Sequence, residues 1–126
     1  MSYATAAELK AFIGTTAGVN AISDADLGTI LTQAYNEINA RLEASGVSIP
    51  ASSATLKTAE LMLGKNPVVT RAKIDGTLTD AEGSAGNYAV YDIDSSIYVL
   101  HTRAIEIVDD YVVSQKRLRQ RAYKVN

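Results

Sequence analysis

The stretch SDADLGTILTQAYNEINARL, residues 23–42, decides the fold. Its apolar residues recur at steps of three and four, which places them on one stripe of an α-helix. They are Leu27, Ile30, Leu31, Ala34, Ile38 and Leu42. Ser23 can cap the first turn, and Gly46 stands where the helix should stop. The sequence therefore predicts a long amphipathic helix that buries one face.

A short helix is predicted upstream of this segment. Thr5 and Glu8 have the spacing of a capping box, in which each side chain satisfies a free backbone N–H of the other residue. Gly14 follows where such a helix would end. These signals predict a helix over residues 6–13.

A third helix is predicted downstream, capped by Ser52 or Ser53 and ending at Gly64. Because its residues are apolar or small on several sides, we expect it to be the central helix. The stretch NPVVTRAKIDG, residues 66–76, then offers an Asn cap, a Pro at the first helical position and a Gly stop. It predicts a separate short helix or a single turn.

Residues 76–94 break every helical period with glycines and small polar residues. Within them NYAVYDI, residues 87–93, alternates well enough for a strand or an extended arm. A helical stripe returns from Ser95 and runs to about Arg121. At about 1.5 Å per residue this last helix spans about 40 Å, more than the diameter of about 35 Å expected for a compact chain of this length. Its end should therefore project beyond the core.

The fold class predicted from these elements is all-α, a small bundle of four to five helices with one long extended loop before a long C-terminal helix. The 126 residues suffice for a single domain over 1–126, and 47% hydrophobic with 21% charged residues is ordinary globular composition. We expect no disulfide, since there is no cysteine, and no membrane segment. The start lacks the layout of a signal peptide, so we expect synthesis in the cytoplasm.

Charge is distributed unevenly along the chain. The last eleven residues, KRLRQRAYKVN, hold five of the twelve basic residues and none of the fourteen acids. Residues 1–115 thus carry a net charge of −7 and the tail carries +5. A basic end on an acidic body suits nucleic acid, an anionic surface or an acidic protein, including a second copy.

The residues give little sign of catalytic chemistry. His101 is the only histidine and lies on the apolar stripe of the last helix, so we expect a core or interface residue instead of a base. Glu106, Asp109 and Asp110 share a helix face, which predicts a solvated acidic face in preference to a weak cation site. There is no nucleophile elbow, and GSAG, residues 83–86, lacks the ending of a phosphate loop. The sequence predicts no enzyme, no cofactor and no metal.

Two segments are candidate interfaces. The basic tail, residues 116–126, is either a solvated helix end or a docking arm, and the apolar residues between its charges favour docking. The loop is either a disordered connector or an arm whose aromatic groups are buried against a partner. The candidate loop contacts are Asn87, Tyr88, Val90 and Tyr91. The candidate tail contacts are Lys116, Arg117, Arg119, Arg121, Tyr123 and Lys124.

Several of these pieces together resemble a known family. The helix TAAELKAFIG, the long helix opening ISDADLGTILTQAYNEINARL, a small-residue third helix and the segment GNYAVY resemble the head-tail connector proteins of tailed bacteriophages and related proviruses, also called adaptor or head-completion proteins. The resemblance covers most of residues 4–93. Asn87, Tyr88 and Tyr91 match the family segment.

The resemblance implies a structural subunit of the virion neck. It implies a homo-oligomeric ring, a dodecamer matching the portal protein, that extends the DNA channel and offers a surface to a tail or stopper protein. DNA would pass through without specific binding, and an acidic body suits such a channel wall. The alternative that the residues leave open is a small nucleic-acid-binding or regulatory protein that uses its basic C-terminal helix on phosphates.

Overall fold

The computed structural model of the chain describes residues 2–13, 22–74 and 93–125. These residues form four helices and no strand: α1 (Ala6–Ile13), α3 (Asp24–Ala44), α4 (Ala54–Ile74) and α5 (Ile93–Val125). The predicted all-α class is therefore confirmed. Residues 76–92 of the loop predicted over 76–94 lie outside the described residues.

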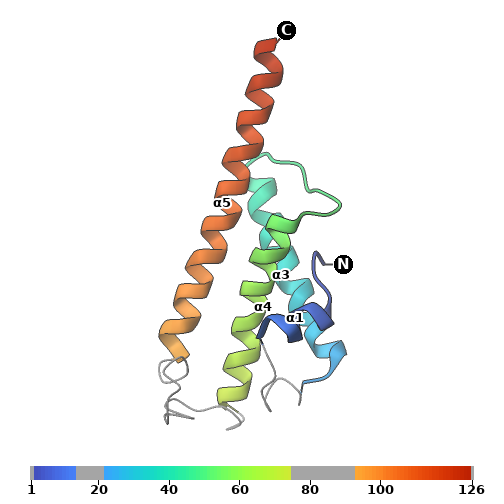
Figure 1. The fold of residues 1–126 in the computed structure, drawn as a ribbon, viewed down its shortest axis with the longest axis vertical. Coiled ribbons are helices and arrows are strands. Elements are labelled where there is room, and N and C mark those ends of the chain that lie inside the picture. The colour runs from blue at the N-terminus through green and yellow to red at the C-terminus, as the bar shows by residue number, and fades with distance from the viewer. Residues whose placement is uncertain (1, 14–21, 75–92, 126) are drawn as a thin grey trace.

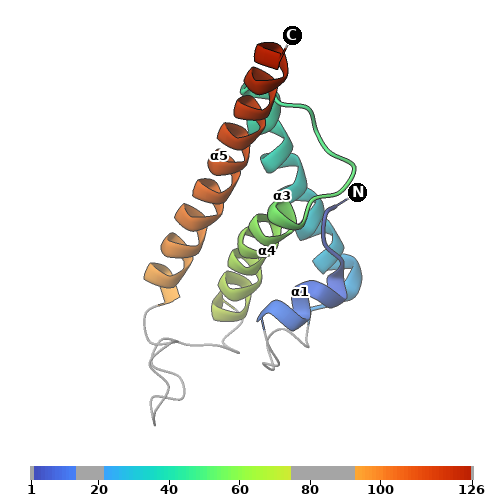
Figure 2. The ribbon, with the colours of Figure 1, turned by 45° about the horizontal axis from the view of Figure 1, so that its top comes forward.

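The three long helices run alternately up and down (Figure 1). α4 lies between α3 and α5, antiparallel to both, and it contacts each of the other three helices. α1 packs against α3 and α4, on the side of α4 away from α5 (Figure 2). The small-residue helix is thus the central one, as its composition predicted.

Two clusters of buried apolar residues hold the helices together. One joins α3, α4 and α5, where Ile38, Leu56 and Val108 are fully buried. The other joins the N-terminal segment, α1, α3 and α4, where Leu9, Leu27 and Val68 are fully buried. Burying a side chain of this size stabilises the fold by about 1.5–3 kcal/mol. The buried stripes therefore contribute more to the stability of the helices than the intrinsic helix propensity of each segment.

The predicted N-terminal caps of α1 and α3 are present. The hydroxyl of Thr5 accepts the backbone N–H of Glu8 at 3.1 Å, and the Glu8 carboxylate accepts the backbone N–H of Thr5 at 3.0 Å. Ser23 caps α3 by accepting the backbone N–H of Asp26 at 3.2 Å. For α4, Ser53 is the capping serine, since its hydroxyl accepts the backbone N–H of Leu56 at 3.2 Å.

Gly46 ends α3 as predicted. It adopts a φ of 74°, a left-handed conformation that glycine reaches without steric cost. The backbone N–H of Val47 then reaches back to the carbonyl of Leu42 at 2.9 Å, which satisfies one of the free carbonyls at the helix end.

The predicted stop at Gly64 is wrong, because α4 continues through Gly64 and Pro67 to Ile74. A Cβ built on Gly64 would lie 3.4 Å from side-chain carbons of Leu9 and Leu31, so this glycine lets three helices approach closely. Beyond it, Val68 is fully buried in the second cluster. That burial offsets part of the roughly 3 kcal/mol that a proline costs inside a helix.

The boundaries predicted for the last helix also need correction. α5 begins at Ile93, so residues 93–94 are helical and do not belong to an extended arm, and it reaches Val125 instead of stopping near Arg121. Its 33 residues span about 50 Å at 1.5 Å per residue. In Figure 1 its C-terminal end extends beyond the connection between α3 and α4.

Candidate functional site

The predicted basic tail forms the last turns of α5, so the candidate contacts lie on one continuous helix. Lys116, Arg117 and Arg119 are exposed, and Leu118 between them is 53% exposed. The side chains of residues 121–125 lie outside the described part of the chain. The described tail side chains thus present cations and an uncovered apolar group to solvent, which is the mixture expected of a docking surface.

Arg119 differs from its neighbours because it binds the chain's own fold. Its Nη1 donates a hydrogen bond to the carbonyl oxygen of Gly46 at 2.8 Å. That carbonyl lies just past the C-terminal end of α3, where the helix dipole is negative and favours a cation. This hydrogen bond therefore attaches α5 to the end of α3 at Arg119. The turn of α5 that follows Arg119 lies beyond this attachment.

A hollow of about 400 Å³ lies along the exposed side of α5 where the tail begins. Its lining among the described residues comes from α5 alone: Asp110, Val113, Ser114, Arg117 and Leu118. Val113 is 46% exposed. An acid, a base and two aliphatic groups therefore stand together in contact with solvent.

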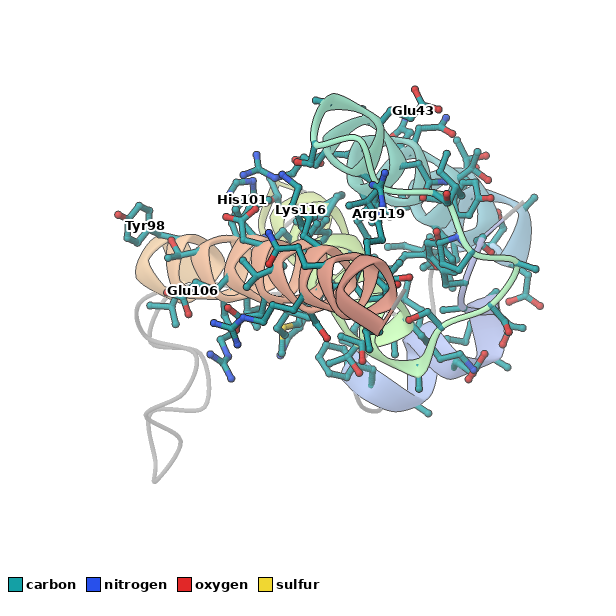
Figure 3. The ribbon with its side chains drawn as sticks, turned by 90° about the horizontal axis from the view of Figure 1, so that it is seen from above. Glu43, Tyr98, His101, Glu106, Lys116 and Arg119 are labelled. Atoms are coloured by element: carbon teal, nitrogen blue, oxygen red, sulfur yellow. The ribbon has the colours of Figure 1, made fainter. Side chains whose placement is uncertain are left out.

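Polar contacts join α5 to α3 on its other side. The imidazole Nε2 of His101 lies 3.6 Å from a carboxylate oxygen of Glu37, and Arg41 binds Asp109 at 3.3 Å. In Figure 3, His101 and Arg119 lie on the side of α5 nearest to α3. Of the two positions predicted for His101, core or interface, the core is wrong, since its side chain is 53% exposed; it faces a carboxylate of α3 at the edge of the contact between α3 and α5.

Glu106, Asp109 and Asp110 of α5 do not gather into a cation site. Asp109 is held by Arg41, and Glu106 pairs with Arg103 at 3.2 Å within α5. Asp110 remains exposed. Among the described residues there is no group of three or more side chains placed to hold a metal ion. The interpretation of these acids as a solvated face accounts for this arrangement.

The candidate loop contacts, Asn87, Tyr88, Val90 and Tyr91, lie outside the described residues. Their predicted role in an interface therefore stays a prediction. Two helical tyrosines lie at the edge of the core: Tyr35 is partly buried and its ring centroid lies 4.8 Å from that of Tyr3, and Tyr111 packs on the first cluster.

Sequence reasoning missed a buried carboxylate at the centre of the fold. Glu60 on α4 is 0% exposed and accepts hydrogen bonds from the backbone N–H groups of Tyr3, at 3.1 Å, and Ala4, at 2.7 Å. Burial raises the pKa of Glu60, although the two backbone N–H groups act in the opposite direction. The only signal in the sequence was one acid among apolar and small neighbours.

A second buried polar contact lies beside it. The hydroxyl of Tyr3 donates to the amide oxygen of Asn39 at 2.6 Å, and Asn39 is 7% exposed. Burial raises the pKa of Tyr3 to about 12, with a further contribution from the neighbouring Tyr35. Since Glu60 is fully buried and both of its oxygens bind the backbone, this cluster has no open position for a substrate and acts as an anchor for the N-terminal segment.

None of the described helices combines the length and the apolar composition that a bilayer-spanning segment requires. Comparisons of the chain with family profiles, with curated proteins and with solved structures give no match.

Proposed function

We propose that this chain is a structural subunit of the neck of a tailed virus, where it forms a ring between portal and tail, extends the DNA channel and completes the head. In this proposal the helices form a small bundle, residues 76–92 form an extended arm toward neighbouring subunits, and the end of α5 docks on the portal. The protein is a virion component without catalytic activity.

The observation that carries the proposal is the cationic end of α5. Lys116 and Arg117 are exposed, Leu118 is 53% exposed, and the helix runs on to Val125 beyond its attachment at Arg119. An exposed apolar side chain among charged residues contributes stabilisation only when a partner removes it from water. The acidic remainder of the chain would line a channel without gripping the phosphates of passing DNA.

The proposed arm supplies the contact between subunits. Tyr88 and Tyr91 are aromatic groups of the kind that anchor interfaces, and the glycines around them allow the arm to order on a partner. Such an arm would bury its apolar groups in the ring and leave the lone subunit soluble.

The test is binding of the full-length protein to purified portal rings from the same virus or provirus, measured by co-sedimentation. Removal of residues 116–126 should abolish docking while the circular dichroism spectrum keeps its helical form. A second variant, K116Q/R117Q/R121Q/K124Q, leaves Arg119 bound to Gly46 and should lose docking equally. Docking that survives both changes would refute the role of the tail. Arg103→Gln neutralises a cation elsewhere on α5 and serves as the control, which should still dock.

The second candidate function is sequence-independent nucleic-acid binding, which the same cluster of basic residues favours. A duplex DNA titration across a range of salt concentrations separates the two. Micromolar or tighter binding that weakens steeply with salt would favour the nucleic-acid-binding function over the neck subunit.

A further inference from the structure

The exposed face of α5 forms a stripe that points away from α4. Glu106, Asp110, Val113 and Arg117 succeed one another at steps of four, three and four, so they lie on one side of the helix. The opposite side carries the buried residues of the first cluster: Ala104, Val108 and Val112. Figure 3 places Glu106 on the side of α5 that faces away from α3. We call Glu106, Asp110, Val113 and Arg117 the outer face.

The charges at the centre of the outer face have no partner within the described chain. Asp110 and Arg117 are both exposed and neither takes part in a hydrogen bond or ion pair, whereas the nearby Asp109 is held by Arg41. Between these two charges lie Val113, 46% exposed, and the hollow of about 400 Å³. The centre of the outer face therefore carries two charges without a partner and a hollow between them.

The order of charges along the outer face decides which occupant fits. Acids precede Val113 and bases follow it, so the face reads acidic to basic along the helix. A second α5 laid across it in the same direction would set Asp110 against Asp110 and Arg117 against Arg117. A second α5 in the opposite direction sets each acid against a base, since Asp110 and Arg117 lie equally far on either side of the midpoint between Val113 and Ser114.

We propose that the outer face binds a second copy of this chain, antiparallel, about a two-fold axis that passes between Val113 and Ser114. Asp110 of each copy meets Arg117 of the other, and the two Val113 side chains fill the hollow together. The interface is isologous, so each pair occurs twice. This dimer does not depend on the proposed neck function and forms without a portal.

The chemistry of the face also fixes the character of the dimer. Each exposed ion pair contributes only about 0.2–1 kcal/mol, and the apolar contribution comes from Val113 and the neighbouring Leu118. The dimer should therefore be weak and dissociate as salt screens the pairs. Because Arg117 belongs to both surfaces, a chain paired in this way is unable to present its tail freely to a portal.

Sedimentation velocity of the full-length protein over a concentration series, in low and in high salt, tests the proposal. In low salt the wild-type protein should form a dimer. Asp110→Arg or Arg117→Glu alone should weaken its dimerisation constant by about tenfold or more, since each change turns two attractive pairs into repulsive ones. The double variant D110R/R117E restores opposite charges across the axis and should recover the dimer. Glu43→Arg makes the same charge change on exposed α3 and should leave dimerisation unaltered.

Recovery in the double variant, with loss in both single variants, supports the antiparallel pair. A wild-type protein that stays monomeric at every concentration overturns it, as does a dimer that the double variant fails to recover. Circular dichroism of each variant verifies that α5 is intact. Portal docking is measured in a separate experiment, so the sedimentation result tests the dimer even if the proposed neck function is wrong.

Discussion

The carboxylate of Glu60 on α4 accepts the backbone N–H of Ala4 at 2.7 Å, across 56 positions of sequence. Both groups are buried, and the second oxygen of the same carboxylate accepts the backbone N–H of Tyr3. A backbone N–H left without an acceptor inside a protein costs free energy, so this one side chain holds the N-terminal segment at two points.

Replacing Glu60 by alanine should destabilise the fold by about 3 kcal/mol, because it orphans two backbone donors and leaves a cavity. Urea denaturation followed by circular dichroism measures the change. Glu43→Ala, at an exposed position of α3, is the control and should alter the free energy of unfolding by no more than about 0.5 kcal/mol. A loss at Glu60 as small as that of the control would contradict its anchoring role.

The stability of the protein should depend on pH through Glu60. Burial raises its pKa above 4.5, so the folded state holds the proton more tightly than the unfolded chain. The stability that this group contributes is full below about pH 4.5 and is lost as pH rises through the folded pKa. The free energy of unfolding, wild type minus Glu60→Gln, should therefore fall as pH rises from 4.5.

Glu8 should show the opposite pH dependence. The hydrogen bond from Lys57 holds its pKa below 4.5, so its contribution is present above that pH and is lost as pH falls through the folded pKa. Glu8→Gln measured over the same acidic range checks this sign. If the difference in unfolding free energy between wild type and variant changed with pH in the same direction for Glu8→Gln and Glu60→Gln, the opposite pKa shifts of the two carboxyl groups would be wrong.

Tyr3 should titrate late and lose its stabilising contact when it does. Its pKa is raised to about 12 by burial, so the stability it contributes is full below pH 10 and is lost as pH rises toward 12. Tyr3→Phe should cost about 1 kcal/mol at neutral pH, through loss of the bond to Asn39, and should flatten the alkaline decline. Tyr98→Phe, at a side chain 73% exposed, should do neither.

Replacing Gly46 or Gly28 by alanine should change the free energy of unfolding in opposite directions, although both glycines have open space beside the Cα. Gly46→Ala should cost about 1 kcal/mol, because a φ of 74° strains any residue with a Cβ. Gly28→Ala should gain up to about 1 kcal/mol, since it lies inside α3. A built Cβ meets nothing within 4 Å at either site, so packing does not confuse the comparison. Thermal unfolding of both variants provides the measurement.

Replacing both Tyr88 and Tyr91 by serine should weaken ring formation on the portal and leave the monomer folded. The reason is that aromatic groups supply interface free energy that serine is too small and polar to replace. Electron microscopy of reconstituted portal complexes counts the rings formed. Unchanged ring formation would remove this segment from the proposed interface.

Local sequence determined where α1 and α3 begin and where α3 ends. The capping pair Thr5 and Glu8, the cap Ser23 and the stop Gly46 act within a few residues, so their effect is independent of the rest of the fold. The stripe in residues 23–42 likewise determined which face of α3 is buried, because a helix places residues three and four apart on the same side.

Only the tertiary structure decided the features that join distant residues. Gly64 and Pro67 are local stop signals, and α4 passes through them because burial of Val68 and close packing on Leu9 and Leu31 outweigh that preference. The roles of Glu60 and Arg119 were equally beyond local reasoning, since their partners lie 56 and 73 positions away in sequence. A side chain's own neighbours set its helical register, whereas the group that meets it is set by how the helices pack.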